Sequence, residues 1–560
     1  MQTMAATYWA REQKVSGYIF KSIKCLTVKQ SLNETGPNQL LLIIMDSLAS
    51  QMAMTLKEQT GKNLVANITY LIINIVIGVF LTPYYVDMLG VAAYAVVPLT
   101  TSLIGYIGLF TDSLNSAVAR HLMIDVQGNS VERANRTFNS ALFGVSKLIL
   151  ILIPVVIVVS LFVPQLFGVP LENTTEATWL FIGMGLAFLL RAWSSSFTVT
   201  LYTSNRLDLI NIINVINIVG QVSLIVALFT ISTPSLTFIG ASYALSAAMA
   251  TALSVMMYKK MNRDLVVRYR HYDKKRFKEM AQMGGWIIIN NIGSLLFLNI
   301  DLIVVNYLFG NVAGGEYAIA FQWVILLRSL AGTFISVIGP IILIAYANKQ
   351  MDRIIAVSKG AVKLTSIGMA LPIGLLCGLA PNVLTAWVGE SFTHLAPLMI
   401  LLLSHLVINT AVTPLFLINT ALNKVRLPAI VTLVGGVGNL LLALFLASPA
   451  GWGIYGVAAA GLISLTLKNF FFTPVYASVV MRAPIHTFYP SIIPGMISMI
   501  IISLMSATFS SIISLNDLIG MAILAGSITI TYLLFTWKFL LNDAERSLMP
   551  VPASIKRRLS

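Results

Sequence analysis

Four basic side chains fall deep inside long apolar stretches of this sequence, where charged groups are rare. Their depth within each stretch follows from the helical rise of about 1.5 Å per residue. At comparable depth the sequence has a single acid, Asp301. A cation at membrane depth is costly unless it faces water, a counter-ion or a substrate, and one acid cannot neutralise four bases. At least some of them should therefore line a wet cavity that receives an anion. The four are Lys147, Arg191, Arg328 and Lys468.

Arg191 and Arg328 are the strongest candidates for binding the anion. They lie nearest the middle of their stretches, and a guanidinium binds phosphate oxygens in bidentate fashion. For Lys147 and Lys468 a second interpretation is open, in which the side chain snorkels or hydrogen-bonds to neighbouring carbonyls. Lys363 is set aside because it lies close enough to a helix end to snorkel, and so is Asp112.

Amide side chains recur at helical spacing in three of the stretches, which puts them on one face of each helix. Two interpretations are open: hydrogen bonds between helices, worth about 0.6–2 kcal/mol per contact, or binding of a saccharide in the cavity. For the second, Asn74, Asn214 and Asn291 are the candidates. The three stripes are Asn67, Asn74 and Gly78; Asn211, Asn214 and Gln221; and Asn291, Ser294 and Asp301.

The elements that must position these residues are membrane-spanning helices. Hydrophobic residues make up 57% of the 560 residues, charged ones 10%, and the mean hydropathy is +0.85, which is typical of an all-α polytopic membrane protein. A span needs roughly 20 apolar residues. About fourteen candidates are found, at 64–86, 90–117, 138–163, 177–203, 209–231, 236–258, 283–308, 315–345, 361–388, 394–421, 428–447, 452–478, 488–511 and 517–541.

Every second connecting loop lacks Lys and Arg, which predicts the orientation in the membrane. Basic loops stay on the cytoplasmic side, so the basic-free loops face outward and both termini are cytoplasmic in a multi-pass protein of the cell membrane. The net charge is +15, and Lys259–Lys278 alone holds nine basic residues. Such a basic loop is better explained by the orientation of the chain in the membrane and by contact with anionic lipid headgroups than by binding of nucleic acid. The basic-free loops lie near 86–90, 164–178, 232–236, 310–316, 389–394, 448–451 and 511–517.

A repeat with a spacing of about 220 residues divides the chain. Six helices per copy return the chain to its starting side, so the two copies should be parallel, with a cavity between two lobes. The matched positions are Ala93-Tyr94-Ala95 with Glu316-Tyr317-Ala318, Glu132-Arg133 with Asp352-Arg353, Arg206 with Arg426, and Gly240-Ala241 with Gly456-Val457. The predicted division is an N-terminal tail and interfacial helix (1–63), an N-lobe (64–258), a basic linker (259–282), a C-lobe (283–480), two extra helices (481–541) and a cytoplasmic tail (542–560).

Motifs for catalysis and cofactors are missing. No outward loop exceeds about 15 residues, which leaves no domain for glycosyl transfer; the five histidines have no metal-ligand spacing; and there is no phosphate loop of the ATPase type. Cys25 and Cys377 form no disulfide framework. We therefore expect no enzyme, no metal and no cofactor.

The sequence resembles the polysaccharide-flippase (Wzx-type) branch of the multidrug/oligosaccharidyl-lipid/polysaccharide exporter superfamily. The likeness rests on the six-plus-six-plus-two helices, Asn299-Ile300-Asp301-Leu302-Ile303-Val304-Val305, Gly314-Gly315-Glu316-Tyr317-Ala318 and Gly453-Ile454-Tyr455-Gly456-Val457-Ala458, and covers about residues 52–541. It implies a two-lobed, alternating-access transporter that moves a polyprenyl-(pyro)phosphate-linked oligosaccharide to the outer leaflet. Glycosyltransferases and a polymerase of the same pathway would be its partners.

Two other functions remain open from the sequence. A multidrug cation antiporter of the same superfamily would be expected to carry acidic sites, whereas the interior here is positive; a membrane-embedded glycan polymerase or ligase would need larger outer loops. Asp301 is the candidate for coupling to an ion. We expect it to pair with Arg328 in one conformation and to take up a proton or a sodium ion in another, with a static pair or a structural carboxylate as the alternative.

Overall fold

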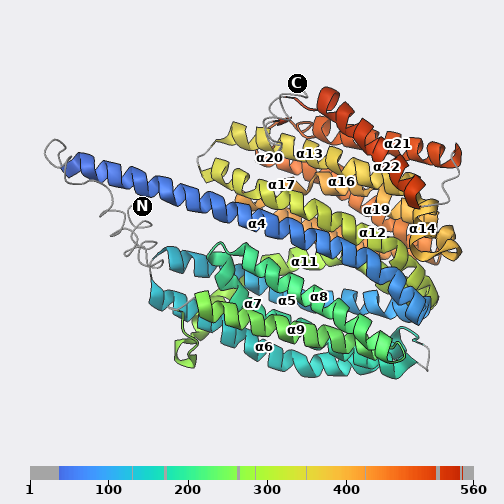
Figure 1. The fold of residues 1–560 in the computed structure, drawn as a ribbon, viewed down its shortest axis with the longest axis horizontal. Helices are drawn as coiled ribbons and strands as arrows, with labels where there is room; N and C mark the ends of the chain where they lie inside the picture. Colours follow the sequence, from blue (N-terminus) through green and yellow to red (C-terminus); the bar gives the residue numbers. More distant parts are fainter. Residues whose placement is uncertain are drawn as a thin grey trace.

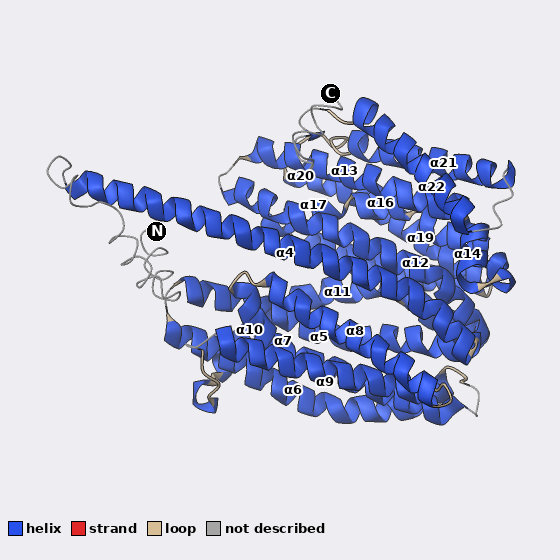
Figure 2. Cartoon of the chain, in the orientation of Figure 1, coloured by secondary structure: helices blue, strands red, loops and turns tan. Residues whose placement is uncertain are grey.

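The computed structural model describes residues 37–128, 130–169, 173–261, 265–283, 285–347, 350–422, 424–512, 518–542 and 545–546. These residues form helices and connecting turns without a strand (Figures 1 and 2), as the composition predicts. Residues 1–36, the loop at 513–517 and most of the C-terminal tail lie outside them.

A first group of helices, α4 to α9, packs together in the lower half of Figure 1, with α4 along its upper edge. The helix α4 extends well beyond the rest of the bundle at one end. The alternation of apolar stretches with short turns produces this up-and-down order. The helices are α4 (Pro37–Leu89), α5 (Val91–Gln127), α6 (Val131–Leu166), α7 (Thr174–Thr203), α8 (Leu207–Ile231) and α9 (Leu236–Met261).

The second group, α11 to α20, fills the upper half of Figure 1, followed by the pair α21 and α22 at the top. Two segments, η4 and η5, are π-helical. The elements are α11 (Gly285–Leu298), α12 (Ile300–Ala347), α13 (Met351–Gly378), α14 (Ala380–Val388), η3 (Glu390–Leu395), α15 (Ala396–Ser404), α16 (Leu406–Ala411), α17 (Thr413–Ala421), α18 (Arg426–Ala447), α19 (Gly453–Thr466), η4 (Leu467–Phe472), α20 (Thr473–Val480), α21 (Tyr489–Ile512), α22 (Leu518–Phe535) and η5 (Thr536–Leu540).

Eleven helices in the described residues are long and apolar enough to span a membrane, or twelve if the bent pair Ile288–Leu298 and Ile300–Thr333 counts as one span. The chain is therefore a multi-pass helical membrane protein, but the predicted count of about fourteen is not confirmed. The spans predicted at 283–308 and 315–345 meet in α12, where the backbone is non-helical at Gly310. The span predicted at 90–117 lies in α5, of which Val91–Tyr106 is the apolar part that was too short to count.

Glycines with positive φ make the turns at the basic-free end of the bundle. Gly90 has φ 78° and ψ 163°, and Gly310, 220 residues later, has φ 80° and ψ 179°. Residues with a Cβ atom rarely adopt this conformation. The equal geometry at this spacing agrees with the repeat, although the domain boundaries themselves remain a prediction.

The two helix groups share one hydrophobic core near the basic-free end. It joins Tyr94 of the first group to Tyr317 and Phe321 of the second. Toward the other end the cores are separate: Phe138 lies in a core built from the first group and α10, whereas Val412 lies in a core built from the second group and α21. The structure is therefore closed at the basic-free end.

A hydrogen bond between the groups reinforces this closure. Pro83 lies inside α4 and has no N–H, so the carbonyl of Val79, four residues earlier, lacks its helical donor. The indole Nε1 of Trp387 in the second group donates to this oxygen at 2.7 Å. The amide of Gln322 donates to the neighbouring carbonyl of Gly78 at 3.3 Å. A proline in the first group thus creates an acceptor for the second.

The basic linker is fastened to the first group rather than hanging free. It contains η2 (Tyr269–His271) and α10 (Lys274–Met283). Arg276 donates to both carboxylate oxygens of Asp125 at 3.0 and 2.8 Å, and the backbone N–H groups of Val266 and Arg268 donate to the side chains of Asn135 and Asn139 at 2.8 Å. Linker and first group therefore form one packed unit.

The helix α21 packs tightly against α13. A Cβ atom at Gly374 would lie 2.8 Å from Ile502 Cβ, and one at Gly378 would overlap Ser506 Oγ. Small residues at such contacts let membrane helices approach closely. Lys363, expected to snorkel, instead donates to Glu545 at 2.8 Å and is only 17% exposed, which ties α13 to the chain after η5.

Candidate substrate-binding site

A cavity of about 260 Å³ lies within the second helix group and holds two of the four predicted deep cations. Arg328 of α12 and Lys468 of η4 both line it, although 140 residues separate them in the sequence. The other lining residues include amides, hydroxyls and two phenylalanines. They are Ser294, Phe297, Leu298, Ala331, Gly332, Asn409, Thr410, Thr413, Phe416, Leu465 and Asn469.

Neither cation forms an ion pair among the described residues. No carboxylate oxygen lies within 4.0 Å of either side chain in that part of the chain. The guanidinium carbon of Arg328 lies 5.9 Å from the ring centre of Phe321, and the ammonium of Lys468 lies 5.3 Å from the rings of both Phe297 and Phe416. The cavity is therefore cationic, with aromatic rather than acidic neighbours.

Asp301 is buried, with 4% of its surface exposed, in the first turn of α12. The hydroxyl of Tyr317 donates to its Oδ2 at 3.1 Å, and Oδ1 has no hydrogen-bond partner among the described residues. The expected pair with Arg328 is not an ion pair in this conformation. The carboxylate thus has one satisfied and one unsatisfied oxygen.

Arg191 belongs to a different site, in the first helix group. Its Nη2 donates to Asn214 Oδ1 at 2.5 Å, which joins α7 to α8, and its buried Nη1 has no partner among the described residues. No residue of the first group lines the cavity that holds Arg328. Two sequence candidates, Arg191 and Asn214, are therefore together, but apart from the C-terminal cations.

Lys147 lies on the surface of α6 beside the linker. Its ammonium is 4.0 Å from the ring centre of Tyr272 and 5.7 Å from that of Tyr269. Asn74 is half-buried on α4, and Asn291 is half-buried on α11, the helix that also supplies Ser294 to the cavity. None of these three residues lines the cavity.

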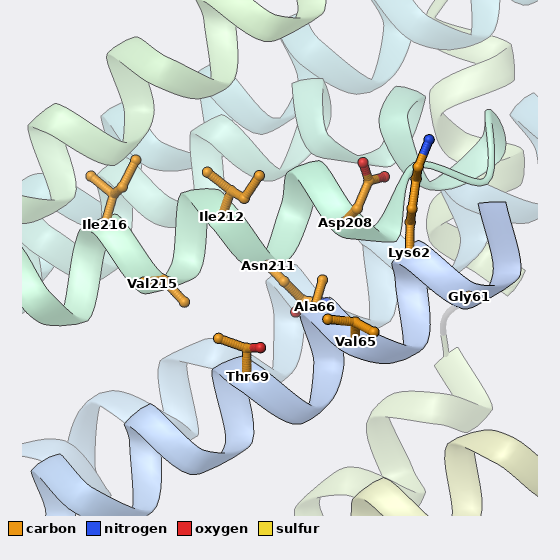
Figure 3. A pocket seen from close by; sticks show the side chains of 10 residues that line it. All are labelled: Gly61, Lys62, Val65, Ala66, Thr69, Asp208, Asn211, Ile212, Val215 and Ile216. Carbon is orange, nitrogen blue, oxygen red and sulfur yellow. The ribbon is translucent and has the colours of Figure 1, made fainter. Parts of the chain in front are cut away.

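A larger groove, of about 560 Å³, runs between α4 and α8 (Figure 3). Figure 3 shows Lys62 and Asp208 at one end, with Ile212, Val215 and Ile216 further along α8. Both charged residues already have partners: Lys62 pairs with Glu58 at 2.7 Å, and Asp208 with Arg206 at 2.9 Å. The groove is mostly apolar and offers no unpaired cation among its lining residues.

The sequence pattern does not identify the aromatic and amide residues of the cavity as site residues. Phe297 and Phe416 look like ordinary core residues in an apolar stretch. Asn469 stands alone in its stretch and Asn409 shares its own only with Asn419, ten residues later, without the helical repetition of the other amides. Asn469 Nδ2 donates to Asn409 Oδ1 at 2.9 Å, and only this contact reveals them as a pair.

Comparison with known proteins identifies the family of this chain. The sequence profile of a family described as "Polysaccharide biosynthesis protein" matches residues 60–343. A Bacillus subtilis (strain 168) protein, "Uncharacterized membrane protein EpsK", is 32% identical over 487 residues, which cover 87% of this chain and 96% of that protein. The chain belongs to the polysaccharide biosynthesis protein family. The resemblance inferred from the sequence is thereby confirmed.

Solved structures give this family member the fold of MATE transporters. An inward-facing multidrug resistance MATE family transporter of the MOP superfamily has a TM-score of 0.56 and 16% identity, covering 75% of this chain and 99% of that one. The Vibrio cholerae MATE transporter VcmN has a TM-score of 0.57 and 13% identity, covering 77% and 97%. At such identities the likeness concerns the fold alone.

Proposed function

We propose that the chain translocates a polyprenyl-(pyro)phosphate-linked oligosaccharide from the cytoplasmic to the outer leaflet of the cell membrane by alternating access. Membership of a polysaccharide biosynthesis family with a transporter fold supports export rather than catalysis. The observation that carries the substrate class is the cavity with Arg328 and Lys468, two cations without a carboxylate within ion-pair range in the described residues.

The phosphate groups of the substrate would supply the missing counter-charge. Charge-assisted hydrogen bonds to phosphate are about twice as strong as neutral ones. For the saccharide part, Asn409, Asn469 and Thr410 line the same cavity with groups that can hydrogen-bond to sugar hydroxyls. The polyprenyl chain stays in the bilayer. A cationic drug would meet like charge at this site, which argues against the antiporter alternative.

The closed basic-free end supports outward transport, with the substrate loaded from the opposite end. A shared core and the bond from Trp387 to Val79 hold that end shut, which supports entry of the substrate from the basic side, predicted from the sequence to be cytoplasmic. With an inside-negative potential, each negative charge that moves fully outward gains about 2.3 kcal/mol per 100 mV. We assign the coupling role to Asp301, whose unsatisfied oxygen can take a proton or a sodium ion.

Export in cells tests this proposal. Arg328→Ala should reduce export of the cell's polysaccharide and leave lipid-linked intermediates in the membrane, and Arg328→Lys should restore part of it because charge survives without the bidentate fork. Arg191→Ala tests whether the first helix group contributes to the same substrate. Normal export by an Arg191→Ala, Arg328→Ala double variant at wild-type protein levels would reject the proposal.

A further inference from the structure

Lys468 occupies an unusual position between two aromatic rings. Its ammonium lies 5.3 Å from the ring centres of Phe297, on α11, and Phe416, on α17. Both rings and Lys468 line the same cavity. We call Phe297, Lys468 and Phe416 the aromatic clamp.

The chain builds this clamp with local devices. Lys468 lies in the π-helical segment Leu467–Phe472, and π-bulges in helices are frequent at functional sites. The next residue, Asn469, is bonded to Asn409, which fixes the segment against α16. Phe297 is 2% exposed, and a Cβ atom at Gly435 would lie 2.6 Å from its ring. Only glycine at 435 leaves room for the ring in this place.

The partners of Lys468 stabilise its charge without neutralising it. The face of an aromatic ring attracts a cation, more strongly when water is excluded, but it carries no net charge. A carboxylate in its place would compete with an incoming anion, which would first have to break an ion pair. Among the described residues Lys468 has no carboxylate within 4.0 Å, so its ammonium remains available to an anion in the cavity.

We propose that Phe297 and Phe416 are positioning residues, which hold Lys468 charged and directed into the cavity so that it binds the phosphate groups of the lipid-linked substrate. This inference rests on the proposed function, because it takes the substrate to be anionic. It adds that affinity for the phosphates depends on aromatic character at two positions that touch no phosphate themselves. Leucine there keeps an apolar side chain, somewhat smaller than phenylalanine, but loses the attraction for the cation.

The test measures binding of farnesyl diphosphate, a short polyprenyl diphosphate, to the full chain in nanodiscs, with farnesol as the uncharged control. We expect wild type to bind the diphosphate more tightly than farnesol. Phe416→Leu, at the half-buried position, should lower affinity for the diphosphate about tenfold and leave farnesol binding unchanged, whereas Phe416→Tyr should keep wild-type affinity. Phe297→Leu and Phe297→Tyr should behave likewise, and melting temperatures establish that each variant is folded.

A double-mutant cycle separates the clamp from the proposed function. In a Lys468→Ala background, Phe416→Leu should have no further effect on diphosphate affinity, because the ring acts through the lysine. If Lys468→Ala weakens diphosphate binding but Phe416→Leu and Phe297→Leu bind as wild type does, the clamp is wrong and the anion site stands. If wild type binds farnesol and farnesyl diphosphate equally, the anionic substrate itself is refuted, and the clamp with it.

Discussion

Replacing Trp387 with Phe removes one hydrogen-bond donor from the contact between the two helix groups and keeps an aromatic ring in place. The indole nitrogen donates to the carbonyl of Val79 at 2.7 Å. Within α4 no other donor can reach this oxygen in the helical pattern, because its partner position is Pro83. The variant therefore leaves a carbonyl without a partner whenever the basic-free end is closed.

The size of the effect follows from this unsatisfied carbonyl. Leaving a buried acceptor unpaired costs about 1–3 kcal/mol, and the cost falls on the closed conformation because opening lets water reach the oxygen. A difference of that size shifts the equilibrium between the two conformations by about 5- to 150-fold toward opening at the basic-free end.

Spin-label distances measure the shift. In a chain without Cys25 and Cys377, labels at Ser232 and Glu390 report on the basic-free end, since both residues are exposed and belong to different helix groups. Trp387→Phe should populate a longer distance between them. Trp323→Phe is the matched control: its ring lies 5.0 Å from that of Trp387, but its Nε1 has no partner among the described residues. Equal distance distributions for wild type and both variants would refute the reasoning.

Three further predictions concern packing, the linker and coupling. Gly378→Val should lower the melting temperature through a clash with Ser506 worth about 1–3 kcal/mol, whereas Gly368→Val, with nothing within 4 Å of its Cβ, should not; equal melting would contradict the packing described for α21. Arg276→Lys should loosen the linker, seen as faster hydrogen exchange at residues 265–283, because the single nitrogen of Lys cannot bind Asp125 and Thr137 together as Nη2 and Nε of Arg276 do; exposed Arg270→Lys is the control, and unchanged exchange would contradict the role of Arg276. Asp301→Asn should remove the dependence of the transport rate on pH or sodium. If the variant keeps the wild-type dependence on both pH and sodium, Asp301 has no coupling role.

Much of the fold was predictable because membrane spans depend on composition and length. The apolar stretches predicted helices, and the distribution of Lys and Arg predicted which turns group together. The glycines at 90 and 310 share one backbone conformation at the predicted spacing. The number of spans was less accessible, because the bends at Gly310 and between α11 and α12 decide how many separate spans the apolar stretches form.

The site was predictable in its charges and not in its geometry. Arg328 and Lys468 stood out because a cation in an apolar stretch is costly. That they meet in one cavity while Arg191 turns to Asn214 depends on how each helix is rotated against its neighbours, which a single sequence does not specify. Phe297 and Phe416 carry no chemical signal of their own, and the carbonyl of Val79 matters only because Trp387 reaches it from another helix.

Translocation in a purified system tests the central claim most directly. Proteoliposomes that contain the protein and a fluorescent polyprenyl-diphosphate-linked saccharide allow the rate of transfer between leaflets to be followed with a membrane-impermeant quencher. We predict transfer by wild type, and at least about a tenfold slower rate for Arg328→Ala, Lys468→Ala, from the loss of two charged contacts. Transfer by this double variant at the wild-type rate would contradict the account. So would the absence of transfer by correctly folded wild-type protein.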